Sequence, residues 1–323
     1  MSVKFALGLL VLILAGCAAA VDRRADVRGS RAEDRWPPIG QFVEVDGTRV
    51  HAVVTGSGPD LVLIHGASGN VRDWTFDFVD RVKDRYRVIV LDRPGHGYTD
   101  RMDGYGGAFQ REGESPAEQA RLLSRAAAEL GVERPVVVGH SYGGAVAMAW
   151  GLDHPAAALV VVSGATMPWP GDLGAQYTVL GSALGGALVA PVVAATAGTD
   201  RVQGVLASIF EPQSPPEGYV DYVGPGLTLR PASLRANARQ VNTLRPHVVT
   251  MSERYPGFAL PVELVHGDTD EIVPLDVHSQ PLSQRLPDAR LTVLEGVGHM
   301  PHHVAPDAVE DAIDRAAARA GLR

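Results

Sequence analysis

A Gly-x-Ser-x-Gly motif is the strongest chemical signal in this sequence. It runs from Gly139 to Gly143 with Ser141 at its centre, after the β-branched residues 136–138 and before an apolar, helix-prone segment at 145–150. A tight strand-to-helix turn of this kind exposes a serine hydroxyl in a strained conformation, and its glycines let the backbone close. The following helix directs its N-terminal N–H groups at the reaction centre, where negative charge develops. The pattern therefore predicts that Ser141 is a nucleophile.

A nucleophilic serine needs a base and an acid that orients the base. Asp268 and Asp270 follow a predicted strand at 261–266, and His299 follows another at 290–294. Functional loops of parallel sheets gather at the carboxyl ends of the strands, so both loops would lie beside the serine. Either aspartate is a candidate for the orienting role on this evidence.

A glycine-containing turn upstream supplies a candidate oxyanion hole. The predicted strand 61–65 runs into Gly66 and Ala67. The backbone N–H of Ala67, with that of Tyr142 directly after the nucleophile, would hold the negative oxygen of a tetrahedral intermediate.

Together these motifs resemble those of the α/β-hydrolase superfamily, in particular its branch with an inserted cap. The resemblance covers residues 41–320 and includes the segment 92–98 and the Gly-His pair that ends at His299. The order serine, aspartate, histidine along the chain also matches. The resemblance implies an α/β fold with a mostly parallel, doubly wound sheet and an inserted helical cap.

The resemblance also selects among the candidate residues. Family members place the acid three residues after the strand-ending glycine, which favours Asp270 and leaves Asp268 to bond within its own loop. The Gly-His spacing favours His299 as the base. His302 and His303 would then begin the next helix or line the mouth of the pocket. His65, His96 and His140 are interpreted as structural residues.

Composition limits the classes of partner. The chain has 323 residues, of which 46% are hydrophobic, enough for one large α/β domain and an insertion. A net charge of −8 without a basic stripe argues against nucleic acid. No GxGxxG, Walker or zinc-like Cys/His pattern is present in the sequence, so we expect no cofactor and no metal. The expected partner is a small acyl compound.

The N-terminus resembles a bacterial lipoprotein signal. Lys4 precedes an apolar run, and the residues at 14–17 match the motif whose cysteine, here Cys17, becomes lipidated. We therefore predict a signal peptide at 1–16 and a flexible, lipid-anchored tether at 17–40. This predicts a protein of the cell envelope, anchored to a membrane and facing away from the cytoplasm. The alternative is a secreted or periplasmic protein released by ordinary signal cleavage.

The rest of the chain divides into two core segments and an insertion. The core is predicted at 41–169 and 259–323, with a helical cap at 170–258 where strand–helix alternation stops. Residues 173–199 carry no charge, and we expect them to roof an apolar pocket. A membrane-inserted segment is the alternative, which the small residues and a central proline disfavour.

Finer signals concern individual elements. An Asp-Gly pair at 46–47 predicts a hairpin, and Ser115 with Glu118 predicts a capping box at a helix start, with Gly131 closing that helix.

The sequence thus predicts a cofactor-free serine hydrolase of carboxylic esters or related acyl compounds. Ser141 would be the nucleophile, His299 the base and Asp270 the orienting acid. A serine at this turn argues against the epoxide hydrolase, haloalkane dehalogenase and dienelactone hydrolase branches. Amidase, aminopeptidase and carbon–carbon bond hydrolase activities remain open. A non-catalytic ligand-binding protein of the same fold is the alternative from another class.

Overall fold

The core is one eight-stranded sheet in the order β1-β2-β4-β3-β5-β6-β7-β8. The structure is a computed structural model that describes residues 3–323. Its strands are β1 (Gln41–Val45), β2 (Thr48–Gly56), β3 (Asp60–Ile64), β4 (Arg87–Leu91), β5 (Val136–His140), β6 (Ala158–Val162), β7 (Val262–Gly267) and β8 (Ala289–Leu294). The pairings β1–β2 and β2–β4 are antiparallel, and all others are parallel. The predicted fold class, a mostly parallel α/β sheet with a helical insertion, is confirmed.

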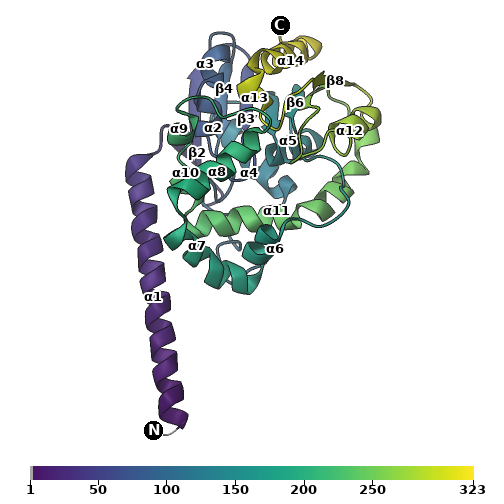
Figure 1. Cartoon of the computed structure of the whole chain (residues 1–323). Helices are drawn as coiled ribbons and strands as arrows, with labels where there is room; N and C mark the ends of the chain where they lie inside the picture. Colours follow the sequence, from purple (N-terminus) through teal and green to yellow (C-terminus); the bar gives the residue numbers. More distant parts are fainter. Residues whose placement is uncertain (1–2) are drawn as a thin grey trace.

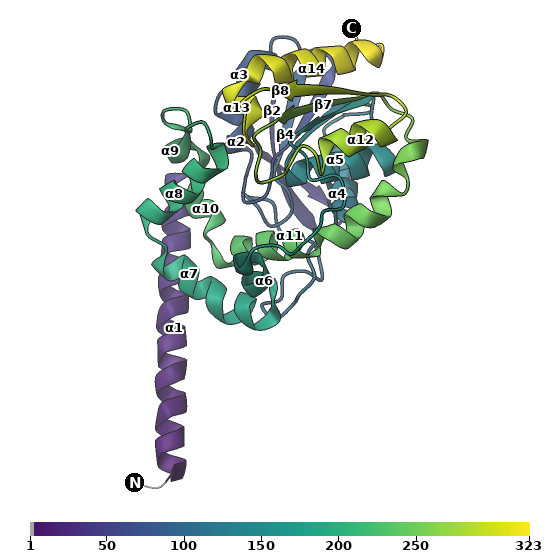
Figure 2. The ribbon, with the colours of Figure 1, turned by 45° about the vertical axis from the view of Figure 1, so that its right-hand side comes forward.

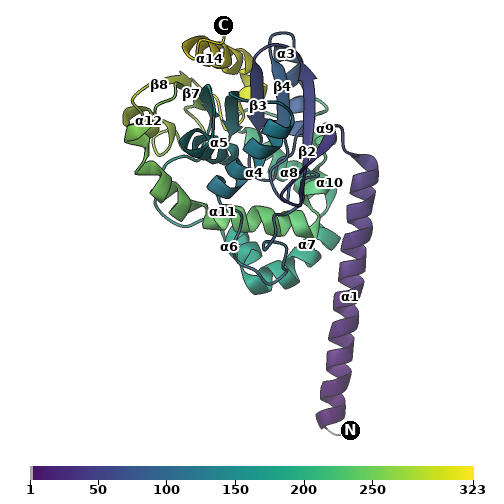
Figure 3. The same ribbon diagram turned by 180° about the vertical axis from the view of Figure 1, so that it is seen from behind.

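Helices cover both faces of the sheet (Figures 1 and 3). The core helices are α2 (Arg72–Thr75), α3 (Phe78–Val82), α4 (Pro116–Glu129), α5 (Tyr142–Asp153), α12 (Ser279–Arg285), α13 (Pro301–Val304) and α14 (Pro306–Arg319). One buried cluster joins the sheet to α4, α5 and α12, and a second joins it to α3 and α14. Burying apolar side chains on both faces is what allows the central strands to be continuously hydrophobic.

Local turn and capping signals hold as predicted. Asp46 and Gly47 both have positive φ angles, 51° and 79°, in the two-residue turn between β1 and β2. At the start of α4 the Ser115 side chain accepts from the Glu118 N–H while the Glu118 side chain accepts from the Ser115 N–H. Gly131 follows this helix with φ 78°.

The insertion between β6 and β7 is helical. It contains α6 (Ala175–Gly181), the π-helical turn η1 (Gly185–Val189), α7 (Ala190–Thr196), α8 (Thr199–Phe210), α9 (Tyr219–Val223), α10 (Pro225–Thr228) and α11 (Pro231–Ser252), and a 3-10 turn η2 (Tyr255–Gly257) leads back to the core. Figure 2 shows α11 between the core and the pair α6/α7. We refer to α6–α11 as the cap.

The outer part of the cap does not roof a pocket, contrary to prediction. Leu184 and Leu188 are 67% and 62% exposed. The cap face toward the core is formed instead by α11 and the segments around α9 and α10, where polar side chains bond to core loops. A run of small apolar residues gives no periodic signal for which face is buried, so the sequence could not decide this.

The prediction of a flexible tether at 17–40 is also wrong for the part that ends at Arg35. Residues Val3–Arg35 form one helix, α1, whose second half packs on the cap. Ala25 is buried against Ala194 and Ala195 of α7, and Arg28 Nη1 donates to the Ala195 carbonyl at 3.3 Å. Alanines on this face let two helices approach closely, but they give no amphipathic pattern, which explains why the sequence concealed the packing.

No single helix within residues 3–323 is both long and apolar enough to cross a bilayer. The segments 175–181 and 185–196 meet that test only when taken together, and they are bent by 93° relative to each other. Cys17 lies exposed on α1.

Candidate active site

Ser141 occupies a strained turn between β5 and α5. Its φ and ψ angles are 53° and −119°, a region that L-residues rarely adopt. A Cβ on Gly139 would lie 2.1 Å from the Gly143 carbonyl oxygen, and one on Gly143 would lie 2.5 Å from the Ile64 carbonyl oxygen. Both glycines are therefore sterically required, as the motif predicted. Ser141 itself is 8% exposed.

Asp270 and His299 meet although 29 residues separate them. The Asp270 Oδ2 atom lies 2.7 Å from His299 Nδ1. The other carboxylate oxygen, Oδ1, accepts the N–H groups of Ile272 and Val273 at 3.0 and 2.9 Å. Both side chains are buried. The carboxylate is thus fixed on one oxygen by backbone donors and directed at the imidazole with the other.

This environment keeps Asp270 ionised. Burial alone would raise its pKa, but hydrogen bonds from His266, His299 and the Val273 N–H hold that pKa well below its usual range. His266 Nε2 lies 3.3 Å from the carboxylate. An ionised carboxylate in this position can stabilise a protonated His299 and fix which ring nitrogen carries the proton.

His140 connects the loop that carries His299 to the turn that carries Ser141. Its Nε2 lies 2.9 Å from the His299 carbonyl oxygen, and the two rings are 4.9 Å apart. Because His140 directly precedes Ser141, this bond places the loop that carries His299 beside the serine. Burial lowers the pKa of His140 well below its usual range, so the ring is neutral. It acts as a structural residue, as the sequence indicated.

The two predicted oxyanion donors lie beside the serine. A Cβ on Gly66 would lie 3.0 Å from Ser141 Cβ, so the turn that carries Ala67 touches the nucleophile. Tyr142 is the first residue of α5, and an N–H in that position has no intrahelical acceptor. The Tyr142 side chain points away into the core, where its Oη accepts from Gln119 at 3.1 Å.

Asp268 does not bond within its own loop as predicted. Its Oδ1 accepts the Gly296 N–H at 2.7 Å, which ties the loop after β7 to the loop after β8. The spacing found in the family distinguished Asp270 from Asp268 as the acid, but it did not predict this contact between the two loops.

Buried histidines around the site are held by structural contacts. His65 accepts the Arg93 N–H at Nε2, 3.0 Å away, and burial lowers its pKa to about 4. His96 Nδ1 lies 3.1 Å from the Pro94 carbonyl oxygen. Neither ring reaches the acid–base pair through these bonds, in agreement with the structural role that the sequence suggested.

The cap contacts the loop that carries His299. Gln213, between α8 and α9, donates to the Gly296 carbonyl at 2.6 Å and accepts the Gly298 N–H at 3.1 Å. This side chain therefore fixes the loop that ends at His299. The sequence contains no local signal for it, because its partners lie more than 80 residues away.

A second cap contact fixes the turn that carries Ala67. Asn237 of α11 accepts the Ser68 N–H at 2.7 Å, and Thr228 of α10 donates to the Ser68 carbonyl at 2.7 Å. Ser68 has a φ of 58°, so two cap side chains hold a strained residue next to Ala67.

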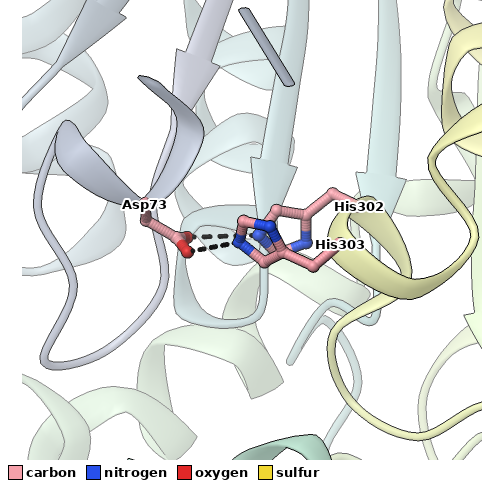
Figure 4. A group of neighbouring side chains, drawn as sticks. All are labelled: Asp73, His302 and His303. Atoms are coloured by element: carbon pink, nitrogen blue, oxygen red, sulfur yellow. Dashed lines mark hydrogen bonds and ion pairs between the residues drawn. The ribbon is translucent and has the colours of Figure 1, made fainter. Parts of the chain in front are cut away.

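Asp73, His302 and His303 form a buried cluster (Figure 4). His302 Nε2 lies 3.2 Å from Asp73 Oδ2, and His303 Nε2 lies 2.9 Å from Asp73 Oδ1. Tyr219 of the cap donates to the same carboxylate at 2.8 Å. The histidines form part of α13, as expected, but they are buried and do not line a pocket mouth.

The protonation of this cluster follows from its contacts. Burial alone would lower the pKa of His303, but bonds to Asp73 and to Asp77, whose carboxylate lies 3.4 Å from Nδ1, raise it to about 9. Burial lowers the pKa of His302 to about 4. The pKa of Asp73 would be raised by burial, but the two imidazoles hold it well below its usual range. The carboxylate oxygen of Asp73 and the ring nitrogens of His302 and His303 that could bind a metal lie within 4.8 Å of one another. The hydrogen bonds described above account for this arrangement.

A mostly parallel sheet with a strained serine in the turn after β5 is the arrangement typical of α/β-hydrolase folds. Residues 61–312 match the Alpha/beta hydrolase family, and the chain belongs to that family. An uncharacterized protein of Mycobacterium tuberculosis (strain ATCC 25618 / H37Rv) is 27% identical over 314 residues, covering 91% of this chain and 85% of that protein.

Solved structures show the same fold. A thermophilic esterase from Thermogutta terrifontis has a TM-score of 0.66 at 20% identity, covering 87% of this chain and 99% of that one. A bacterial membrane phospholipase A has a TM-score of 0.63 at 23% identity, covering 97% and 99%.

Proposed function

We propose that this protein is a serine hydrolase that cleaves a carboxylic ester or a related acyl compound. The observation that carries the proposal is the buried Asp270–His299 pair, 2.7 Å apart, on a loop bonded to the residue before Ser141. A strained serine, an oriented imidazole and an ionised carboxylate are the three components of nucleophilic acyl transfer.

Each group has a defined task in the proposed reaction. Ser141 Oγ attacks the carbonyl carbon while His299 Nε2 removes the hydroxyl proton. The N–H groups of Ala67 and Tyr142 stabilise the oxyanion. The tetrahedral intermediate collapses to an acyl-enzyme as His299 gives the proton to the leaving alcohol. Water then attacks the acyl-enzyme by the same route and restores Ser141.

An ester substrate is favoured by structural likeness. The two similar structures named above are described as an esterase and as a membrane phospholipase A. By analogy, we propose that the bond cleaved in the substrate of this chain is an ester bond.

The proposal includes attachment to a membrane through the N-terminus, with the domain outside the cytoplasm. It is supported by the lipoprotein-type motif that ends at Cys17 and by the exposure of that cysteine on α1. Cys17→Ser should abolish incorporation of a palmitate analogue. Incorporation that persists in this variant would contradict lipidation at Cys17.

The activity is tested by labelling with a fluorophosphonate, which reacts with activated serines. The wild-type protein should be labelled, and Ser141→Ala should lose the label and on the order of 10⁴-fold or more of ester hydrolysis while its circular dichroism spectrum is unchanged. Ser163→Ala is the matched control, because Ser163 is a buried serine with positive φ at the end of the neighbouring strand β6. A folded, unlabelled wild-type protein would favour the non-catalytic binding protein instead.

A further inference from the structure

An exposed apolar corner on the cap has no role in the proposed reaction. It consists of Val179, Leu184, Leu188 and Val192, which are between 44% and 67% exposed. No residue from 173 to 199 is charged. Residues 184, 188 and 192 recur every four positions, and exposed apolar patches mark sites of interaction with proteins or membranes.

The shape of this corner suits contact with a broad surface better than insertion into a groove of a partner. Helix α6 and the η1–α7 segment meet at 93°, so the aliphatic side chains at 184 and 188 stand on a convex bend. Protein interfaces are enriched in tyrosine, tryptophan and arginine, whereas this segment has one aromatic residue, Tyr177, and no arginine. The composition fits the hydrocarbon boundary of a lipid layer.

Helix α1 identifies the direction of that lipid layer. It packs along α7 through Ala25, and its other half extends past the corner formed by α6 and α7 (Figures 1 and 2). The extending half is apolar and exposed: its exposed large side chains are Phe5, Leu7, Leu9, Leu10, Val11, Leu12, Ile13 and Leu14. Arg23 and Arg24 follow this run in the sequence, and basic side chains next to an apolar segment bind anionic lipid headgroups.

We propose that the cap corner inserts into the same lipid surface that receives the N-terminal half of α1. The contact is interfacial and does not span the bilayer, because the corner is a bend of two short helices. The orientation rests on the membrane attachment proposed above. Where cleavage before Cys17 removes the N-terminal half of α1, the acyl chains on Cys17 mark the same lipid surface, and where α1 stays whole, its apolar half does so. It is independent of the catalytic proposal. The cap then faces lipid, and a lipid-borne ester would reach the cap without crossing water.

The experiment measures depth at single sites on the full chain. Cys17→Ser removes the only cysteine, and a fluorophore sensitive to polarity is then attached at Leu188→Cys. Gln284→Cys, exposed on α12 of the core, is the matched control, and Leu10→Cys reports on α1. Each labelled protein is reconstituted into phosphatidylcholine–phosphatidylglycerol vesicles with and without lipids that carry a nitroxide on the acyl chain.

The expected result is strong quenching by nitroxide lipid and weak quenching by iodide at residues 188 and 10, with the reverse at residue 284. Quenching by lipid at residue 10 alone would overturn the cap proposal while N-terminal attachment stands. Quenching at neither site would overturn both. Protection of residue 188 from iodide without lipid quenching would mean that a second copy of the chain covers the corner, which also overturns the proposal.

Discussion

The two faces of the cap differ in chemistry. The inner face bonds to the core through polar side chains: Gln213 holds the loop before His299, and Asn237 and Thr228 hold Ser68. The outer face exposes aliphatic side chains such as Leu184 and Leu188. Asn237 is buried and needs a partner, so its identity depends on the core loop to which it bonds. The side chains of Gln213 and Thr228 are partly buried. The exposed leucines of the outer face make no such bonds, and we attribute them to the proposed lipid contact.

This difference separates two kinds of substitution. A change on the inner face should alter catalysis in any solution, because it moves atoms next to the serine. A change on the outer face should matter only where the cap meets lipid.

Asp270→Asn should lower kcat by roughly 10³–10⁴-fold, because it removes the charge that stabilises protonated His299 and disturbs its tautomer. The matched change Asp268→Asn alters a partly exposed loop contact to Gly296 and should cost far less. Steady-state hydrolysis of a p-nitrophenyl ester measures both. A larger loss for Asp268→Asn would show that Asp268, and not Asp270, orients His299.

Asp73→Asn should reduce the free energy of unfolding by about 3 kcal/mol at pH 6, because it leaves buried His303 without its main partner. Asp77→Asn is the control, since Asp77 is 40% exposed and should cost about 1 kcal/mol or less. Urea unfolding monitored by fluorescence gives both values.

The ion pair between Asp73 and His303 predicts that the free energy of unfolding depends on pH. The pKa of His303 is raised from 6.5 to about 9, so its contribution is full below pH 6.5 and is lost as pH rises through 9. The pKa of Asp73 is lowered from 3.8, so its contribution is present above pH 3.8 and is lost as pH falls further. The difference in unfolding free energy between wild type and Asp73→Asn should therefore shrink above pH 9. A difference that stays constant to pH 10 would mean that His303 is not the charged partner.

Gln213→Ala should lower kcat by about tenfold, because two hydrogen bonds that position the loop before His299 are lost. Gln203→Ala, exposed on α8, removes the same kind of side chain from a site without such contacts. Equal rates for the two variants would show that the cap does not position the base.

Leu184→Asp and Leu188→Asp should have the smallest effects in solution. If either leucine contacted the acyl chain, each substrate methylene would contribute up to about 0.8 kcal/mol and the charge would flatten the preference for longer chains. Because both are exposed, we expect the chain-length profile for soluble p-nitrophenyl esters to stay within about twofold of wild type. A flattened profile would place the outer face next to the substrate and remove the distinction between the two faces.

The sequence predicted the parts of this molecule that depend on local chemistry. Gly139, the Asp-Gly hairpin and the Ser115 capping box all result from contacts within a few residues. Gly143 belongs to the same local motif, although the backbone that it approaches is that of Ile64. Strand order brings both candidate loops to one edge of the sheet. The choice of Asp270 and His299 within those loops came from the family resemblance.

What the sequence could not predict depends on distant contacts. The bonds of Gln213, Asn237 and Asp73 join segments more than 80 residues apart. The packing of α1 on α7 uses alanines, which carry no periodic signal. The orientation of the cap leucines depends on which face of an evenly apolar segment meets the core. Each of these features is determined by the assembled fold.

The most direct test of the central account is to trap the acyl-enzyme. A p-nitrophenyl ester mixed with the enzyme should release a burst of nitrophenolate equal to the protein concentration, and acid quenching within the burst should leave the acyl group on the peptide that contains Ser141. Mass spectrometry of the quenched protein identifies the modified residue. Steady turnover with no adduct, or an adduct on another residue, would contradict Ser141 as the nucleophile.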